Sequence, residues 1–220
     1  PFEFRYLKSA NGDVLVARMG FTADLGYEFW MPPQQCTGFT AQIDAARAAL
    51  SLGVPGYGLN ALEACRLEGG FVVAGWDFAT ELDPQPGFER TPFETGLGWL
   101  VDLEGTDFVG REALSALRTN ARYLIRRIST DATGSLVGVP LIAKVDSQVL
   151  TIGIVNCSAW SWGLGTTIGN ASIEPAFRDI EACWLDLEGK RFDVQLQRGP
   201  HIQLARRDQI PAPLNSFRVD

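Results

Sequence analysis

Six short runs rich in Val, Ile and Leu fill the second half of the chain, and they constrain its fold more than any other feature. Turn residues separate the runs at intervals typical of strands in a small closed sheet. Glu188-Gly189, for example, is a compact turn between the last two runs. The pattern predicts an all-β barrel or sandwich after about Asn120. The runs are Tyr123–Ile128, Val139–Val145, Val149–Val155, Thr166–Ile173, Cys183–Leu187 and Phe192–Leu196.

The first part of the chain mixes strand and helix patterns. Strand-like stretches at Phe2–Lys8 and Val14–Met19 flank Asn11-Gly12, a pair that tolerates positive φ and favours a hairpin turn. A further extended stretch follows at Gly26–Met31. Apolar residues then recur at helical spacing between Phe39 and Leu50. These patterns predict a small sheet followed by a helix.

Two more short helices are expected before the barrel. Asn60 and Glu63 are spaced as a capping box for a helix that runs to Glu68, and Gly110 opens another. We therefore predict an α+β fold. Residues 1–118 would form a mixed α/β domain, and residues 119–220 a C-terminal β-barrel domain.

Composition excludes several classes of function. The net charge is −7, and the densest basic runs are only Arg126-Arg127 and Arg206-Arg207, so we expect no nucleic-acid partner. No apolar run approaches the roughly 20 residues of a membrane span. The chain has four cysteines without a C-x-x-C pair and a single histidine, His201, which argues against a metal site. A catalytic Cys–His pair is one reading, but incidental free cysteines are more common. With no visible leader, we expect a reducing, cytoplasmic location.

The segment GFTADLGYEFW, residues 20–30, does not follow the alternation of an ordinary strand. It places two glycines, two acids and several aromatic rings side by side. One reading is a binding site that uses Glu28, with Gly26 and Tyr27 shaping the approach. The other reading is a hairpin in which Asp24 and Trp30 are structural.

Three other residues attract attention. Arg66 lies three residues after Glu63 on the expected helix, and the default reading is an ion pair between them. Trp160 and Trp162 are two residues apart, so they share one side of an extended segment. They either fill the end of the barrel core or form part of a cage for a methylated cation.

Four motifs together resemble those of the T-protein (aminomethyltransferase) superfamily, from about Pro1 to Leu196. GFTADLGYE and GLNALEACRLEGG are similar to two family motifs near the start. TPFETGLGWLVDLEGTDFVGREAL is similar to a third, and GIVNCSAWSWGLGTTIGNASI lies where the family has a fourth. All four occur in the family order with near-family spacing.

The resemblance implies a fold, a cofactor and site residues. Family members have a folate-binding mixed α/β body followed by a barrel-like domain, and they move a one-carbon unit onto tetrahydrofolate. Glu28 matches a carboxylate that contacts folate, and a carboxylate suits the paired N–H donors of a pterin. Tyr27 belongs to the same motif. Trp99 matches a tryptophan that lines the folate site, and Arg178 aligns with a substrate-side or folate-side arginine.

The chain also departs from the family pattern. Leu62 stands where T-proteins have a ligand-binding arginine, and Ala23-Asp24 replaces Gly-Glu. The catalytic aspartate of T-proteins belongs to an N-terminal part that has no counterpart here, so the catalytic residue is unknown. Because the chain starts at Pro1 without a Met, we expect it to be the later part of a longer polypeptide, whose upstream portion would be a partner.

The leading hypothesis is a tetrahydrofolate-dependent methyl or aminomethyl transferase, of a demethylase-like kind, acting on a small methylated donor. The first alternative is the folate-binding half of a sarcosine- or dimethylglycine-type flavin dehydrogenase. The second is a non-enzymatic, folate-binding iron–sulfur assembly factor, although the K-G-C-Y-x-G-Q motif of those proteins is missing. The fragment alone is expected to be inactive.

Overall fold

The computed structural model describes residues 3–10 and 12–207, which divide into two compact units. Of the described residues, one unit contains those up to Leu62 together with those from Ile202 onward, and the other contains Glu63–His201. Their limits do not coincide with the predicted domain boundary between residues 118 and 119, and that boundary stays a prediction.

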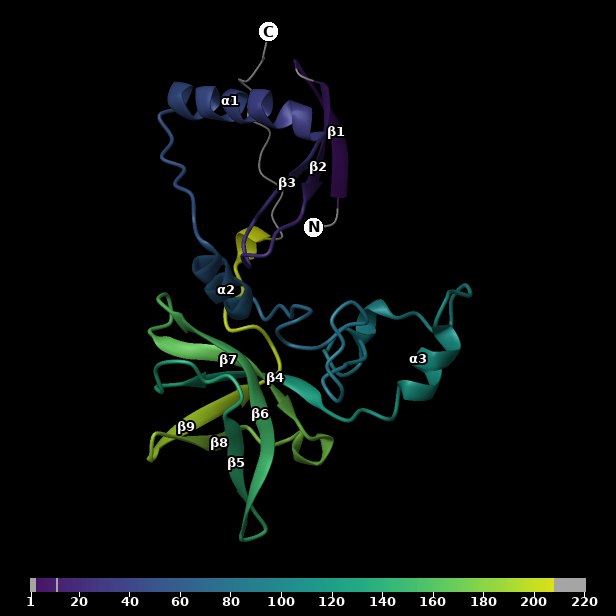
Figure 1. Ribbon diagram of the computed structural model, residues 1–220, viewed down its shortest axis with the longest axis vertical. Helices are drawn as coiled ribbons and strands as arrows, with labels where there is room; N and C mark the ends of the chain where they lie inside the picture. Colours follow the sequence, from purple (N-terminus) through teal and green to yellow (C-terminus); the bar gives the residue numbers. More distant parts are fainter. Residues whose placement is uncertain (1–2, 11, 208–220) are drawn as a thin grey trace. The chain divides into compact units, whose positions relative to one another are not determined.

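The first unit contains a three-stranded antiparallel sheet in the order β1-β2-β3 (Figure 1). Its strands are β1 (Glu3–Ser9), β2 (Gly12–Arg18) and β3 (Glu28–Trp30). Ser9 pairs with Gly12, whose φ of +117° is a conformation that glycine tolerates. The predicted hairpin is therefore confirmed, while Asn11 of the expected turn pair lies outside the described residues.

Helix α1 (Pro33–Ala49) follows the sheet and contacts it through aromatic rings. The ring centroids of Phe29 in β3 and Phe39 in α1 are 5.0 Å apart, with the rings tilted by 50°. The helix begins earlier than the apolar spacing predicted because Pro33 is compatible with a first helical turn. The short element η3 (Ala205–Arg207) also belongs to this unit, and the guanidinium of Arg18 donates a hydrogen bond to its Arg207 carbonyl over 3.2 Å.

Helix α2 (Leu59–Glu68) corrects one sequence-based prediction. Asn60 lies inside the helix instead of preceding it, so the expected capping box is wrong. The carboxylate of Glu63 instead accepts hydrogen bonds from Arg66, one helical turn further along. An arginine with a buried guanidinium competes more strongly for that carboxylate than a backbone N–H group does.

Irregular segments precede the barrel in the second unit, with η1 (Gly98–Leu100) and α3 (Arg111–Leu117) among them. Gly110 caps the start of α3 with a φ of +94°, as its position in the sequence suggested. The carboxylate of Glu94, which is 2% exposed, accepts hydrogen bonds from the backbone N–H groups of Thr91 and Arg122, both over 2.7 Å. Glu94 thus ties this segment to the chain that enters the first barrel strand.

Six antiparallel strands close into a barrel in the order β4-β7-β6-β5-β8-β9 (Figure 1). The prediction of an α+β fold with a small barrel is confirmed, and the sandwich alternative is wrong. The strands are β4 (Leu124–Thr130), β5 (Pro140–Val145), β6 (Gln148–Ser161), β7 (Thr166–Ile173), β8 (Ala182–Leu187) and β9 (Lys190–Gln197), with η2 (Pro175–Phe177) between β7 and β8.

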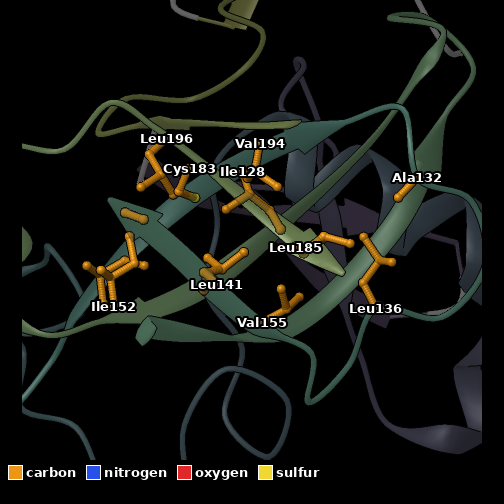
Figure 2. Packing of buried hydrophobic residues seen from close by; sticks show 13 residues of the cluster. Ile128, Ala132, Leu136, Leu141, Ile152, Val155, Cys183, Leu185, Val194 and Leu196 are labelled. Carbon is orange, nitrogen blue, oxygen red and sulfur yellow. The ribbon is translucent and has the colours of Figure 1, made fainter. Parts of the chain in front are cut away.

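Apolar side chains from all around the sheet fill the barrel. Figure 2 shows Ile128, Leu141, Val155, Leu185 and Val194 lying in the space that the strands enclose. Each of these side chains is at most 1% exposed. The alternation of inward and outward side chains along each strand explains why every run contributes to this core.

Strands β6 and β7 approach each other closely at two glycines. A Cβ atom added at Gly169 would lie 2.3 Å from the carbonyl oxygen of Cys157, and one added at Gly153 would lie 2.3 Å from that of Ser172. Both obstacles are backbone atoms, which cannot rotate away. Only glycine fits the β6–β7 pairing at these two positions.

Substituting Gly169→Ala should destabilise the protein by about 1–3 kcal/mol or more, because the strands must separate to admit the methyl group. Urea unfolding measured by circular dichroism gives the difference. Gly199→Ala is the matched control, since a Cβ there meets nothing within 4 Å. Equal stability of the two variants would show that the close approach at Gly169 is not a constraint.

Candidate functional site

A buried arginine, Arg66, forms the centre of the most elaborate polar arrangement in the second unit. Its side chain is 1% exposed and lies on α2. The predicted ion pair with Glu63 is confirmed: Nε is 2.7 Å from Oε2, and Nη2 is 2.5 Å from Oε1. A second ion pair joins Nη1 to Oδ2 of Asp77 over 2.6 Å, and that carboxylate is fully buried.

Asp77 connects this arginine to the barrel. Its Oδ1 accepts hydrogen bonds from the thiol of Cys157 in β6 and from Nδ2 of Asn170 in β7, both over 2.9 Å. Its Oδ2 also accepts one from the backbone N–H of Val73 over 2.8 Å. We call Glu63, Arg66, Asp77, Cys157 and Asn170 the Asp77 cluster.

A β-bulge in β6 positions Cys157, a barrel residue of the cluster, together with its neighbour Asn156. The register between β6 and β7 shifts between Val155 and Cys157, so Asn156 is the extra residue. Nδ2 of Asn156 donates to the backbone carbonyl of Asp77 over 3.1 Å, and the Cys157 thiol reaches the carboxylate of the same residue. Bulges commonly re-aim side chains in this way next to functional sites.

The electrostatics of the Asp77 cluster suit a rigid frame better than a reactive centre. Burial, and then the negative charge of Asp77, raise the pKa of the Cys157 thiol well above its usual range. Burial alone would lower the pKa of Arg66, but the hydrogen bond that Arg66 donates to Glu63 and the nearby negative charges raise it overall. The arginine therefore stays charged and the thiol stays protonated, which leaves no thiolate nucleophile here.

A pocket of about 570 Å³ opens beside the cluster. Trp76 and Phe88 give it aromatic walls, while Glu63, Asn156 and Cys157 supply polar groups. The Trp76 indole is 50% exposed, and the guanidinium of Arg66 lies 5.7 Å from its ring centroid. A mainly apolar pocket with a few fixed polar groups is suited to a flat organic ligand.

Glu94, the other buried carboxylate of this unit, is held by backbone N–H groups. Although burial raises its pKa, hydrogen bonds from the backbone of Thr91, Arg122 and Tyr123 lower it overall. Both oxygens are engaged, Oε2 by Thr91 and Oε1 by Arg122 and Tyr123. Glu94 is consequently ionised and structural, and it is poorly suited to transfer a proton.

Glu28 and Tyr27 lie at the start of β3 in the first unit. Glu28 is half-buried, its backbone pairs with Ala17 of β2, and its Oε2 accepts a hydrogen bond from the Trp30 indole over 3.2 Å. Tyr27 is 45% exposed. Glu28 therefore has a place in the hairpin and also carries an accessible carboxylate, so its role in a folate site stays a prediction.

The loop that leads to Glu28 explains the two glycines of its motif. A Cβ atom added at Gly20 would lie 3.2 Å from Cα of Gly26, so the two ends of the loop nearly touch. Between them, Ala23 has a φ of +63°, in the left-handed region that favours glycine. The family pattern has glycine at that position, and this chain holds an alanine there instead.

Trp99 and Arg178, the other two predicted folate contacts, lie in the second unit. Trp99 is in η1 and is 74% exposed, so its indole is available to a ligand. Arg178 directly follows η2 on the surface, where its Nε donates to the carbonyl of Pro175 over 3.1 Å. Their roles stay predictions.

Trp160 and Trp162 do not fill the end of the barrel core. Trp162 is 89% exposed and Trp160 is 37% exposed, so that reading is wrong. Their ring centroids are 6.3 Å apart, with the planes 79° from parallel. The pair is an exposed edge-to-face arrangement, which leaves indole surface open to a partner or ligand.

His201 does not support the catalytic Cys–His reading. Among the described residues, no cysteine thiol forms a hydrogen bond with it, and Cys157 is engaged by Asp77. Burial, and then the positive charge of Arg127, lower the pKa of His201 to about 4. Its backbone N–H donates to the carbonyl of Glu68 over 2.9 Å.

Two further kinds of feature are absent from the described part of the chain. No cluster of three or more histidine, cysteine, aspartate or glutamate side chains there is arranged to hold a metal ion. No helix there has the length and apolar character needed to cross a membrane.

Sequence reasoning predicted two of the five residues of the Asp77 cluster. It paired Arg66 with Glu63 but did not assign Asp77, Asn170 or Cys157 to that arginine. Asp77 follows Trp76 in an irregular segment, where no helical or strand periodicity indicates which way its side chain points. The available signal was indirect: a buried arginine needs more negative charge than one partly buried glutamate supplies.

Comparison with known proteins identifies the fold and the family. Residues 2–105 match the family model of the GCVT N-terminal domain. The chain is 31% identical over 197 residues to an aminomethyltransferase of Synechococcus elongatus, and this match covers 87% of this chain and 48% of that protein. It is also 31% identical over 185 residues to a trimethylamine-oxide aldolase of Ruegeria pomeroyi, covering 80% of this chain and 22% of that protein.

A solved structure agrees with these sequence matches. The glycine cleavage system aminomethyltransferase T from Bartonella henselae superposes with a TM-score of 0.68 at 18% identity, over 86% of this chain and 50% of that one. The fold is thus of the T-protein type. The chain belongs to the T-protein (aminomethyltransferase) superfamily, and it spans about half the length of the curated aminomethyltransferases that it matches.

Substituting Asp77→Asn should cost about 3–5 kcal/mol of unfolding free energy, because it removes one partner of a buried ion pair. The new amide would also point a donor at the donors of Arg66, Asn170 or Cys157. Chemical denaturation is the measurement. The control is Asp186→Asn, which breaks an exposed pair with Arg191 at 3.7 Å and should change stability by less than about 1 kcal/mol. A small, equal effect in both variants would contradict the structural role of Asp77.

Folding stability should also fall between about pH 6.5 and pH 4 through His201. In that window the unfolded chain takes up a proton on His201 while the folded protein stays neutral there, so protonation favours unfolding. The loss is at most about 3 kcal/mol and is complete below the folded pKa.

Proton NMR of this single histidine gives the pKa directly, and His201→Gln should remove this component of the pH dependence. A titration midpoint near 6.5 in the folded protein would contradict the prediction.

Proposed function

We propose that the chain is part of a tetrahydrofolate-dependent methyl or aminomethyl transferase that acts on a small methylated donor. Membership of the T-protein superfamily supports the reaction class. The observation that carries the cofactor assignment is the accessible carboxylate of Glu28 at the start of β3, within the motif that resembles the family's folate contact.

The surroundings of Glu28 fit a pterin. Oε2 already accepts from Trp30, and among the described residues Oε1 has no hydrogen-bond partner. A carboxylate with one free oxygen on a half-buried side chain can accept from N–H donors at the edge of a heterocycle. The exposed ring of Tyr27 lies next to it in the chain and offers an apolar face. Tetrahydrofolate, when bound, supplies a nitrogen nucleophile that accepts the one-carbon unit.

In this proposal the residues of the chain bind and orient, and the proton-transfer group lies elsewhere. Asp77 and Glu94 are saturated by hydrogen bonds, and the thiol of Cys157 stays protonated. We therefore expect the catalytic acid to come from polypeptide outside these residues. Positioning by the segments present here would still contribute a large part of the rate.

The donor class that we favour is a methylated amine. One relative is named for trimethylamine oxide, an N-methylated compound. The exposed Trp160–Trp162 pair supports the same class, because indole faces attract methylated cations by about 0.5–2 kcal/mol per contact. Leu62, in place of the family arginine, is also consistent with a donor held differently from that of a glycine-cleavage T-protein.

The same relative also keeps the flavoprotein alternative open. The matched region covers only 22% of the trimethylamine-oxide aldolase, so this segment occurs as a module of a much longer polypeptide in that relative. A sarcosine- or dimethylglycine-type dehydrogenase would combine modules in the same way. The visible absorption of flavin in the complete purified protein distinguishes this alternative.

Substituting Glu28→Gln should weaken tetrahydrofolate binding by roughly ten- to a hundredfold, because a charge-assisted hydrogen bond is worth about 1.5–3 kcal/mol. Calorimetry on the complete protein with reduced folate measures this. Asp13→Asn is the control, since Asp13 is an exposed acid in β2 of the same unit, outside the motif. Unchanged affinity in Glu28→Gln would remove Glu28 from the site, and no folate binding by the unmodified protein would refute the proposed function.

A further inference from the structure

A second pocket, of about 300 Å³, lies at one end of the barrel interior. Two of its lining residues mark the position: Leu196 belongs to the buried barrel core, and Ile180 packs against that core. The other notable feature of the lining is positive charge, from Arg126, Arg178 and Arg198. The mouths of β-barrels are frequent ligand sites. We call this pocket the arginine mouth.

Arg126 is the most unusual of the three arginines. It lies on β4 two residues before the core residue Ile128, so both side chains leave the strand on the same face. It is 9% exposed. Yet no ion pair joins it to a carboxylate among the described residues, and its guanidinium donates only to the backbone carbonyl of Arg178. Buried charges in proteins are normally paired.

A second arginine of the lining, Arg198, approaches the same carbonyl, while the Arg178 side chain donates to Pro175 instead. Nη2 of Arg198 lies 3.5 Å from the carbonyl oxygen of Arg178, and the side chain of Arg178 extends from that residue. Burial, and then the positive charge of Arg198, lower the pKa of Arg126. Backbone carbonyls carry no net charge, so the three guanidinium groups in this lining concentrate positive potential around a small volume.

Two acidic residues, Asp179 and Glu181, offset part of this positive charge. Asp179 pairs with Arg198 over 2.8 Å, but both side chains are largely exposed, at 82% and 68%. Exposed pairs of this kind are weak, so Arg198 can exchange this partner for another. Glu181 also lines the mouth. Three positive and two negative side chains leave a net positive lining, with the terminal nitrogens of Arg178 unbonded among the described residues.

From this geometry we propose that the arginine mouth binds a small dianion, either a phosphate group or a pair of carboxylates, between Arg126, Arg178 and Arg198. Planar guanidinium groups bind both chemistries with paired hydrogen bonds. The anion would neutralise the buried charge of Arg126 and would displace Asp179 from Arg198. The inference does not rest on the proposed transferase function, because anion binding is measured without folate or donor.

The experiment uses isothermal calorimetry at low ionic strength with inorganic phosphate, succinate and acetate as separate titrants. We expect saturable binding of phosphate or succinate at one site per chain, and at least tenfold weaker binding of acetate. Preference between phosphate and succinate identifies the group that the mouth accepts. Failure of both dianions to bind saturably would overturn the proposal.

Variants that are expected to change dianion affinity in opposite directions distinguish a specific binding site from non-specific electrostatic attraction. Arg178→Gln and Arg198→Gln should each weaken dianion binding by about tenfold or more, as expected for the loss of a charge-assisted contact. Asp179→Asn should tighten it by about two- to fivefold, because it removes a competing carboxylate. Arg191→Gln, an exposed arginine that lies over the Trp184 ring on the β8–β9 hairpin, is the matched control and should leave affinity unchanged.

One outcome of this variant series would contradict the proposal. Equal weakening by Arg191→Gln and Arg178→Gln would mean that the anion responds only to net charge. A melting temperature that is unchanged in Arg178→Gln and Asp179→Asn shows that the affinity differences do not come from unfolding.

Discussion

The buried ion pair between Arg66 and Asp77 is the interaction on which the second unit depends. Removing both charges from water is expensive, and the cost is offset only if every remaining hydrogen-bonding atom finds a partner. The chain meets that requirement with groups from three places: Glu63 on α2, Val73 in the following loop, and the side chains of β6 and β7. One guanidinium thereby joins a helix, an irregular loop and a barrel wall.

This requirement also explains the irregularity of β6. A regular strand would not direct Asn156 and Cys157 toward the same residue, because neighbouring side chains point to opposite faces. The bulge at Asn156 removes that restriction and lets both contact Asp77, one at its carbonyl and one at its carboxylate. The same bulge shapes the wall of the 570 Å³ pocket, so the ion pair and the pocket share one structural cause.

The sequence predicted what depends on local pattern and missed what depends on distant contacts. Alternation and turn residues gave the barrel strands, and glycine positions gave the hairpin and the start of α3. The capping role of Asn60 was wrong because Arg66 competes for Glu63. Asp77 and Asn170 could not be joined to Arg66 from sequence, since they are 11 and 104 positions away from it and no period links them. Glu28 was singled out by family resemblance, and its accessibility could be judged only in three dimensions.

The second unit treats its two buried arginines in opposite ways, and the difference separates a structural role from a binding role. Arg66 is bound by two carboxylates, so its charge is satisfied by the fold alone. Arg126 is almost as well shielded from water, but it is given only a backbone carbonyl, with two more arginines beside it. A fold that already supplies acids for one internal arginine could supply one for the other. A second charge without a paired carboxylate, at the rim of a cavity, is the arrangement that an anionic ligand would complete.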